Sequence, residues 1–183
     1  MKNGIRICKP TSITYSGTSA SNSGQGSIEF SSVNELILNG VFTSLYDNYM
    51  IVCRLQHSSA SSITSRLALG GVTNSTSSSY SFQSLQANGT TVSASRTTPV
   101  SNVRWDISYS SGTQRAGFTM YVYGPSIAQP TAFRSVTISD TSDGEIIDYA
   151  GTHNQSVQYD GIRFYFGGVT GGTGLISVYG LVD

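Results

Sequence analysis

Short runs in which apolar and polar residues alternate recur along most of this chain, and they limit the folds open to it. The clearest run places four residues on one face: Tyr49, Ile51, Cys53 and Leu55. About ten such runs follow at spacings of roughly 8–15 residues, separated by turn pairs such as Asn39-Gly40 and Asn88-Gly89. No window has a helical period. The sequence therefore predicts an all-β fold, an antiparallel β-sandwich of jelly-roll type.

The chain divides by composition into an arm and a domain. Its 183 residues suit one sandwich domain better than two. Residues 1–26 are rich in Ser, Thr, Gly and Asn and hold Pro10, whereas the alternating runs begin at Ser27. We expect an extended N-terminal arm over residues 1–26 and a jelly-roll domain over residues 27–183. The arm is either a disordered tail or a docking segment that lies along a partner.

Charge is sparse and balanced. Charged residues make up 11% of the chain and the formal net charge is zero, against about 25% charged residues in typical domains. There is no basic surface signal for nucleic acid. No run approaches the roughly 18 apolar residues of a membrane span. The sequence from Met1 to Arg6 lacks the apolar stretch of a signal peptide. We expect neither nucleic-acid binding nor membrane insertion.

Cysteine and histidine are too few for a zinc site. The chain has two cysteines, Cys8 and Cys53, and two histidines, His57 and His153, with no zinc-ligand spacing. The two cysteines could pair, but Cys53 lies in an apolar run, where a buried free thiol is the expected state. The sequence predicts no metal ligands and unpaired thiols.

None of the candidate catalytic or binding groups in the sequence matches the motif that its chemistry requires. His153 and Asp148 could be joined with a serine, but no Gly-x-Ser-x-Gly nucleophile motif precedes a helix. Four acidic residues cluster in the sequence: Asp140, Asp143, Glu145 and Asp148. Their spacing does not match an EF-hand loop, so a polar turn is the expected reading and calcium binding stays open. The glycine pairs at 167–168 and 171–172 lack the lysine of a phosphate loop. We predict a non-enzymatic protein without catalytic or cofactor-binding residues and without a cofactor.

Tyrosine is the one plentiful aromatic. Ten tyrosines fall in or beside the predicted strands: Tyr46, Tyr49, Tyr80, Tyr109, Tyr121, Tyr123, Tyr149, Tyr159, Tyr165 and Tyr179. A tyrosine offers apolar area with a polar tip, which suits sugar stacking or a subunit interface. We expect most of them to be half-buried on the two sheets.

A resemblance to a known family rests on motifs spread along nearly the whole chain. They are Lys9-Pro10-Thr11, Thr14-Tyr15-Ser16-Gly17, Leu38-Asn39-Gly40-Val41-Phe42, Tyr46-Asp47-Asn48-Tyr49, Tyr123-Gly124-Pro125, Asp148-Tyr149-Ala150-Gly151-Thr152-His153 and Ser177-Val178-Tyr179-Gly180. In their order they resemble small phage virion proteins with jelly-roll domains, which include minor tail and fibre-tip proteins and capsid decoration proteins. The resemblance implies a virion component, usually trimeric and without catalysis. It supplies no site residues.

Three functions follow as expectations. The first is a non-enzymatic, homotrimeric tail or fibre-tip module of a phage that contacts the host surface, with a glycan as the expected receptor. The second is a capsid decoration, or cement, protein that stabilises the head, with its arm across neighbouring major capsid subunits. The third is a glycan-cleaving enzyme. The first two place the protein in the virion, among other virion proteins, and do not decide between head and tail.

Overall fold

The structure is a computed structural model that describes residues 4–57, 61–107, 115–139, 145–167 and 171–182. These residues contain β-strands and no helix, and hence no helix that could cross a membrane. The strands are β1 (Ile5–Ile7), β2 (Ser12–Asn22), β3 (Ile28–Asn39), β4 (Asn48–His57), β5 (Ser61–Leu69), β6 (Val72–Thr73), β7 (Tyr80–Asn88), β8 (Thr91–Val100), β9 (Val103–Ile107), β10 (Arg115–Tyr123), β11 (Thr131–Ser139), β12 (Glu145–His153), β13 (Gly161–Tyr165) and β14 (Gly172–Leu181).

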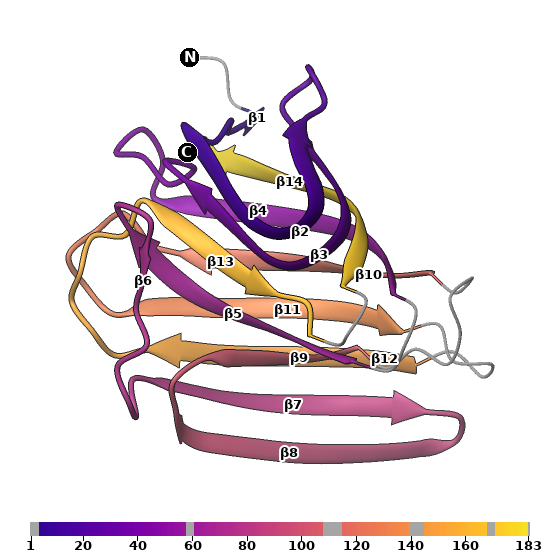
Figure 1. The fold of residues 1–183 in the computed structure, drawn as a ribbon. Helices are drawn as coiled ribbons and strands as arrows, with labels where there is room; N and C mark the ends of the chain where they lie inside the picture. Colours follow the sequence, from indigo (N-terminus) through magenta and orange to yellow (C-terminus); the bar gives the residue numbers. More distant parts are fainter. Residues whose placement is uncertain (1–3, 58–60, 108–114, 140–144, 168–170, 183) are drawn as a thin grey trace.

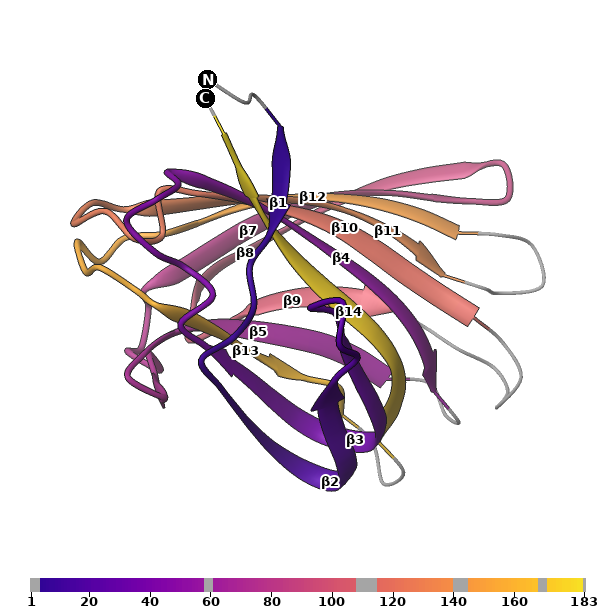
Figure 2. The same ribbon diagram turned by 90° about the horizontal axis from the view of Figure 1, so that it is seen from above.

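The strands form a sheet that curls back on itself into two layers (Figures 1 and 2). Its order is β6-β5-β13-β3-β14-β4-β10-β11-β12-β7-β8, and β1, β2 and β9 pair with β14, β3 and β5. The back layer runs from β4 to β8, and the front layer holds β3, β13, β5 and β9. Every pairing between these strands is antiparallel. The predicted all-β antiparallel sandwich of jelly-roll type is confirmed.

The core lies between the layers, where the alternating pattern predicts it. Tyr49, Ile51, Cys53 and Leu55 of β4 are all buried. Across from them, Phe164 of β13 packs on Phe118 of β10 with ring centroids 5.8 Å apart. Burying one large apolar side chain stabilises a fold by about 1.5–3 kcal/mol, so these facing rows hold the layers together.

The predicted arm is extended and hydrogen-bonded to the sandwich. Strand β1 pairs with the end of β14. Strand β2 pairs with β3 from Ser12 opposite Asn39 to Asn22 opposite Ile28. The side chains of Ile13 and Ala20 are partly buried and pack against the core. The described part of the arm is therefore a component of the sheet, and its docking to another protein stays a prediction.

Strand β3 bends sharply, and this bend shapes the surface beside it. Its alternating residues fall in two short runs, Ser27–Phe30 and Glu35–Leu38, and the structure joins these runs in one strand through Ser32, whose φ is 49°. Opposite the bend, the β2–β3 register shifts between Ser16 and Gly17. A side chain at Gly17 would overlap the Ser32 carbonyl oxygen and lie 2.7 Å from the Cα of Val33, so only glycine fits there.

Candidate functional site

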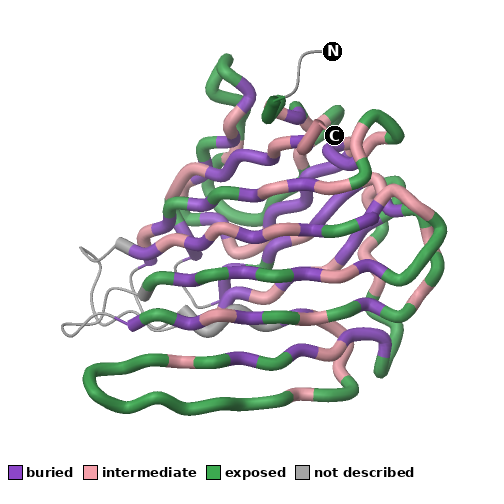
Figure 3. Tube along the Cα trace, turned by 180° about the vertical axis from the view of Figure 1, so that it is seen from behind, coloured by how far each residue is buried: buried purple, intermediate pink, exposed green. Residues whose placement is uncertain are grey.

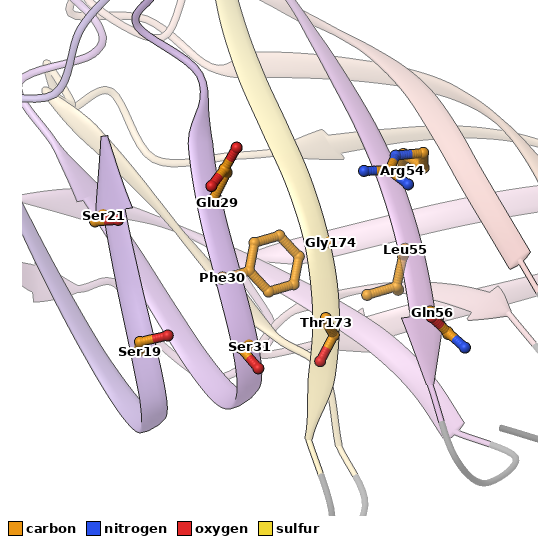
Figure 4. Close-up of a pocket in the computed structure, with 10 residues that line it drawn as sticks. All are labelled: Ser19, Ser21, Glu29, Phe30, Ser31, Arg54, Leu55, Gln56, Thr173 and Gly174. Carbon is orange, nitrogen blue, oxygen red and sulfur yellow. The ribbon is translucent and has the colours of Figure 1, made fainter. Parts of the chain in front are cut away.

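A groove of about 310 Å³ opens where β2, β3, β14 and β4 curve past one another (Figure 4). It is lined by Ser19, Ser21, Glu29, Phe30, Ser31, Arg54, Leu55, Gln56, Thr173 and Gly174. We call it the Gly174 groove.

Gly174 forms the floor of the groove together with two apolar side chains. In the register, Gly174 lies between Phe30 of β3 and Leu55 of β4. A Cβ at this position would overlap the Arg54 carbonyl oxygen and lie 3.0 Å from the Cζ of Phe30. Phe30 is held from below by a stacked contact with Phe166, with ring centroids 4.8 Å apart. Only a glycine therefore lets β14 lie this close to the backbone of Arg54 and to the ring of Phe30.

Opposite charges stand on the two walls. Glu29 and Arg54 both pair with Leu175 in the register, one on each side of β14, and both side chains are exposed. Their strands are two strand spacings apart, or roughly 10 Å. Figure 4 shows the carboxylate and the guanidinium on either side of β14. A ligand in the groove would meet a hydrogen-bond acceptor on one wall and a fork of donors on the other.

Hydroxyl groups complete the lining. Ser19 lies opposite Ser31 in the β2–β3 ladder, and Ser21 lies opposite Glu29. The Oγ1 atom of Thr173 accepts a hydrogen bond of 3.0 Å from the backbone N–H of Ser32, which fixes this side chain at the bend. Each hydroxyl both donates and accepts. The lining therefore matches a ligand that carries many hydroxyl groups of its own.

The structure separates the two residues considered for a triad. His153 and Asp148 lie on opposite faces of β12. His153 is fully buried, and its Nε2 atom lies 2.6 Å from the hydroxyl of Tyr159. Asp148 points to solvent and forms an ion pair with Arg134 at 3.0 Å.

The acidic cluster is likewise dispersed where it is described. Asp140 and Asp143 lie outside the described residues. Glu145 is buried and accepts a hydrogen bond from the side-chain amide of Gln86, whereas Asp148 faces outward. Over the described ranges, no group of three or more His, Cys, Asp or Glu side chains is placed to hold a metal ion.

Both cysteines are free and buried. The sequence predicts unpaired thiols and the burial of Cys53, but not the burial of Cys8. Burial raises the pKa of each thiol, and the pKa of Cys53 is the more strongly shifted.

Among the tyrosines, four are almost fully buried: Tyr49, Tyr80, Tyr149 and Tyr159. Tyr123 and Tyr165 are exposed, and Tyr109 lies outside the described residues. No tyrosine lines the Gly174 groove as described, so the expected sugar-stacking role has no support at this site.

The Gly174 groove does not follow from the sequence. Its lining residues come from four strands. Two of these residues, Ser19 and Ser21, belong to the segment expected to be an arm. The sequence holds one signal of a close contact between strands at this place. Gly174 lies in a strand, and a glycine within a strand is typical of a bulge or a close backbone approach. The register of β14 against β3 does shift between Gly172 and Gly174.

Comparisons with known proteins give distant structural likenesses alone. No family model matches the chain, and no curated protein sequence matches it. Domain 4 of AbnA, a GH43 extracellular arabinanase from Geobacillus stearothermophilus solved with arabinotriose, is similar with a TM-score of 0.33 and 11% identity. That match covers 99% of this chain and 84% of that one. A seed lectin of Lotus tetragonolobus is similar with a TM-score of 0.29 and 10% identity, over 100% of both chains. Neither likeness carries an argument about function at these scores, so function is argued from the chain's own residues.

Proposed function

We propose that this protein is a non-enzymatic virion module of a phage, and that its Gly174 groove binds a saccharide of the host surface. The observation that carries the proposal is the lining of the groove. Hydroxyl, carboxylate and guanidinium groups surround a floor at Gly174, below which lie the almost fully buried side chains of Phe30 and Leu55. Binding sites for small polar ligands combine such a floor with a few convergent polar groups.

Saccharides suit this lining because each hydroxyl of a sugar donates one hydrogen bond and accepts others. Glu29 would accept from a hydroxyl, Arg54 would donate to one or two oxygens, and Thr173 would do either. The C–H face of a pyranose ring would lie over Gly174, where no side chain stands in its way. The virion location rests on the resemblance of the sequence motifs to phage jelly-roll proteins.

The number of carboxylates in the groove favours binding of a saccharide over its cleavage. Hydrolysis of a glycosidic bond generally uses two carboxyl groups about 5–10 Å apart. Among the described residues that line the groove, Glu29 is the one acidic side chain. A single carboxylate can orient a sugar but cannot act as both acid and base partner in that reaction.

The test is a binding measurement with purified protein and a panel of surface polysaccharides and their oligosaccharides. We expect one class to bind, and Arg54→Ala to weaken binding by about 10- to 100-fold, because a hydrogen bond to a charged group is worth about 1.5–3 kcal/mol. Arg96→Ala is the matched control, since Arg96 is an exposed arginine on β8 outside the groove.

Three results would contradict the proposal. The first is saccharide binding that Arg54→Ala leaves unchanged, and the second is no binding across the panel. The third is release of new reducing ends from a bound polysaccharide, which would make the protein an enzyme.

A further inference from the structure

A trough crosses the outer surface of the back layer, on the side of the sheet that faces away from the core. One hollow of about 510 Å³ involves β7, β8, β11 and β12, and its outward-facing lining residues are Ser81, Gln83, Arg96, Ala132, Ala150 and Thr152. An adjoining hollow of about 370 Å³ shares Gln83 and Ala150 and continues to Arg134 and Asp148. We call the two hollows together the Ala150 trough.

The sizes of neighbouring side chains explain the trough. In the register, Ala150 of β12 lies between Arg134 of β11 and Gln83 of β7. Side chains directly opposite one another in an antiparallel pair have Cβ atoms about 4.5–5.5 Å apart, so Ala150 forms a low floor between two long side chains. Eight of the ten residues of β8 are exposed, and Figure 3, which views this surface from behind, shows that outermost strand exposed over nearly its whole length. The trough is therefore open to solvent on its β8 side.

Two tyrosines of β10 stand beside the trough. Tyr121 and Tyr123 are two positions apart and share the outward face, with ring centroids 6.3 Å apart and ring planes 15° apart. Tyr123 is 40% exposed and lies opposite Ala132, which lines the trough. Tyr121 lies opposite Arg134. The nearly parallel rings offer apolar area with polar tips, which suits packing against the C–H face of a sugar ring.

The trough carries more positive than negative charge. Its described charged side chains are Arg96, Arg134 and Asp148. Asp148 accepts hydrogen bonds from Nε and Nη2 of Arg134, at 3.4 and 3.0 Å. These bonds use two of the five N–H donors of the guanidinium, so Arg134 keeps three for a ligand. Arg96 is exposed, and no carboxylate of the described residues forms an ion pair with it. The trough is therefore complementary to an anionic group.

Neutral hydrogen-bonding groups complete the lining. The hydroxyls of Ser81 and Thr152 form an exposed pair 3.0 Å apart, and the amide of Gln83 lies between Ala150 and Arg96 in the register. Hydroxyls and amides both donate and accept. One excess positive charge among neutral polar groups suits a ligand with many hydroxyls and one anionic group per unit. A nucleic acid instead needs several cations along its phosphate backbone.

We propose that the Ala150 trough is a second saccharide site, and that its ligand is an acidic oligosaccharide whose units carry a carboxylate. One sugar unit lies over Ala150 with its carboxylate towards Arg96 and the free donors of Arg134. The next unit lies over Ala132 and against the ring of Tyr123. The trough is separate from the Gly174 groove, and the proposal stands whether or not that groove binds a saccharide.

The test is isothermal titration calorimetry with oligosaccharides of uronic acids and of sialic acid, each paired with its carboxyl-reduced form. We expect an acidic oligosaccharide to bind and its reduced form to bind about 10- to 100-fold more weakly, because the hydrogen bonds to a charged group are lost. Arg96→Ala should weaken binding of the acidic form by a similar factor. Poly-glutamate, which has the carboxylates without the hydroxyls, should bind no better than the reduced saccharides.

Two pairs of substitutions test the floor and the aromatic wall. Ala150→Trp fills the floor and should abolish binding of the acidic saccharide. Val92→Trp is its matched control, because Val92 is 74% exposed on the same face and outside the trough. Tyr123→Phe keeps the ring and should retain the affinity, whereas Tyr123→Ala should lower it. The β-sheet circular dichroism signal confirms that each variant is folded.

The two saccharide sites depend on different arginines. Ala150 lies three strands and four residues from Arg54, which is roughly 20 Å. Arg54→Ala should therefore leave binding in the trough unchanged, and Arg96→Ala should leave binding in the Gly174 groove unchanged. Saccharide binding that needs Arg96 but not Arg54 supports the trough and counts against the groove. Binding that needs only Arg54 does the reverse.

Absence of binding by every acidic oligosaccharide would overturn the proposal, and so would equal affinity for an acidic oligosaccharide and its reduced form. Binding that survives Ala150→Trp would place the site elsewhere on the protein. Poly-glutamate that binds as tightly as the best saccharide would also overturn the proposal, because the trough would then accept an acidic peptide.

Discussion

The imidazole Nε2 of His153 lies 2.6 Å from the hydroxyl oxygen of Tyr159, and both side chains are buried in the core. The same hydroxyl accepts a hydrogen bond of 2.8 Å from the side-chain amide of Asn74. The hydroxyl keeps one hydrogen to donate, and a neutral His153 ring can accept it at Nε2. The ring of Tyr80 packs on that imidazole with centroids 4.2 Å apart. This network joins β12 to β7 and to the segment after β6.

Acid should destabilise the protein through His153. Burial lowers the pKa of His153 from 6.5 to about 4, and a hydrogen bond with the Ser79 backbone opposes this shift. Because the folded pKa is the lower one, the unfolded chain takes up a proton first as the pH falls. The contribution is complete above about pH 6.5 and is lost between 6.5 and 4, with a total of about 3 kcal/mol. Urea unfolding at pH 7 and at pH 4.5 measures it. In His153→Gln the loss over this range should be smaller, and an equal loss in both proteins would contradict the assignment.

Removing the Tyr159 hydroxyl should cost about 1–3 kcal/mol of unfolding free energy, because Tyr159→Phe leaves the buried imidazole of His153 and the partly buried amide of Asn74 without this partner. Tyr165→Phe serves as the control. Tyr165 is exposed, and its ring contact with Arg163 does not need the hydroxyl. We expect that variant to lie within about 0.5 kcal/mol of the wild type. Equal effects of the two substitutions would mean that the network adds nothing.

Strands with strict alternation were predictable from the sequence, and strands without it were not. The run from Tyr49 to Leu55 predicts both β4 and its buried face, because one side of the strand meets the core. Strand β8 was missed, since both of its faces are largely exposed and half of its residues are Ser or Thr. Strand β2 was missed for the same reason, and its few core contacts, Ile13 and Ala20, are seven residues apart. These strands form because their backbones hydrogen-bond to a neighbouring strand. Such hydrogen bonding leaves no alternation of apolar and polar residues in the sequence.

The Gly174 groove was beyond prediction because it depends on which strands become neighbours. Glu29 and Arg54 are separated by 25 positions in the sequence and meet only through β14. The separation of His153 from Asp148, in contrast, follows from strand geometry. Residues five apart in one strand point to opposite faces. The sequence thus shows which residues of one strand can share a site, but not which residues of different strands come together in one.

Gly174→Ala should both destabilise the fold and impair the groove. The added methyl group would overlap the Arg54 carbonyl oxygen, so β14 or β4 must shift. We expect a loss of about 1–3 kcal/mol in unfolding free energy, the range of overpacking substitutions. Gly4→Ala is the control, since nothing lies within 4 Å of a Cβ at Gly4. Unchanged stability in Gly174→Ala would show that the strands at the floor are looser than the structure indicates.

The two thiols should react slowly in the native protein. Cys8 and Cys53 are buried, and burial raises the pKa of both, so little thiolate is available at pH 8. We expect a disulfide reagent to label them about 100-fold or more slowly than an exposed thiol introduced by Ser93→Cys on β8. Full unfolding in denaturant should remove the difference. Rapid labelling of Cys53 in native buffer would contradict its place in the core.

Deleting residues 1–26 distinguishes a docking arm from a structural strand. Strand β2 covers one edge of β3, whose Leu36 and Leu38 are fully buried. The deletion removes the backbone hydrogen bonds of that edge together with the packing of Ile13 and Ala20. We expect a clear drop in melting temperature, whereas deletion of residues 1–4, which precede β1, should have little effect. If the larger deletion folds with full stability and only loses its place on the capsid, the arm is a docking segment. The capsid decoration function then replaces the host-surface function as the better proposal.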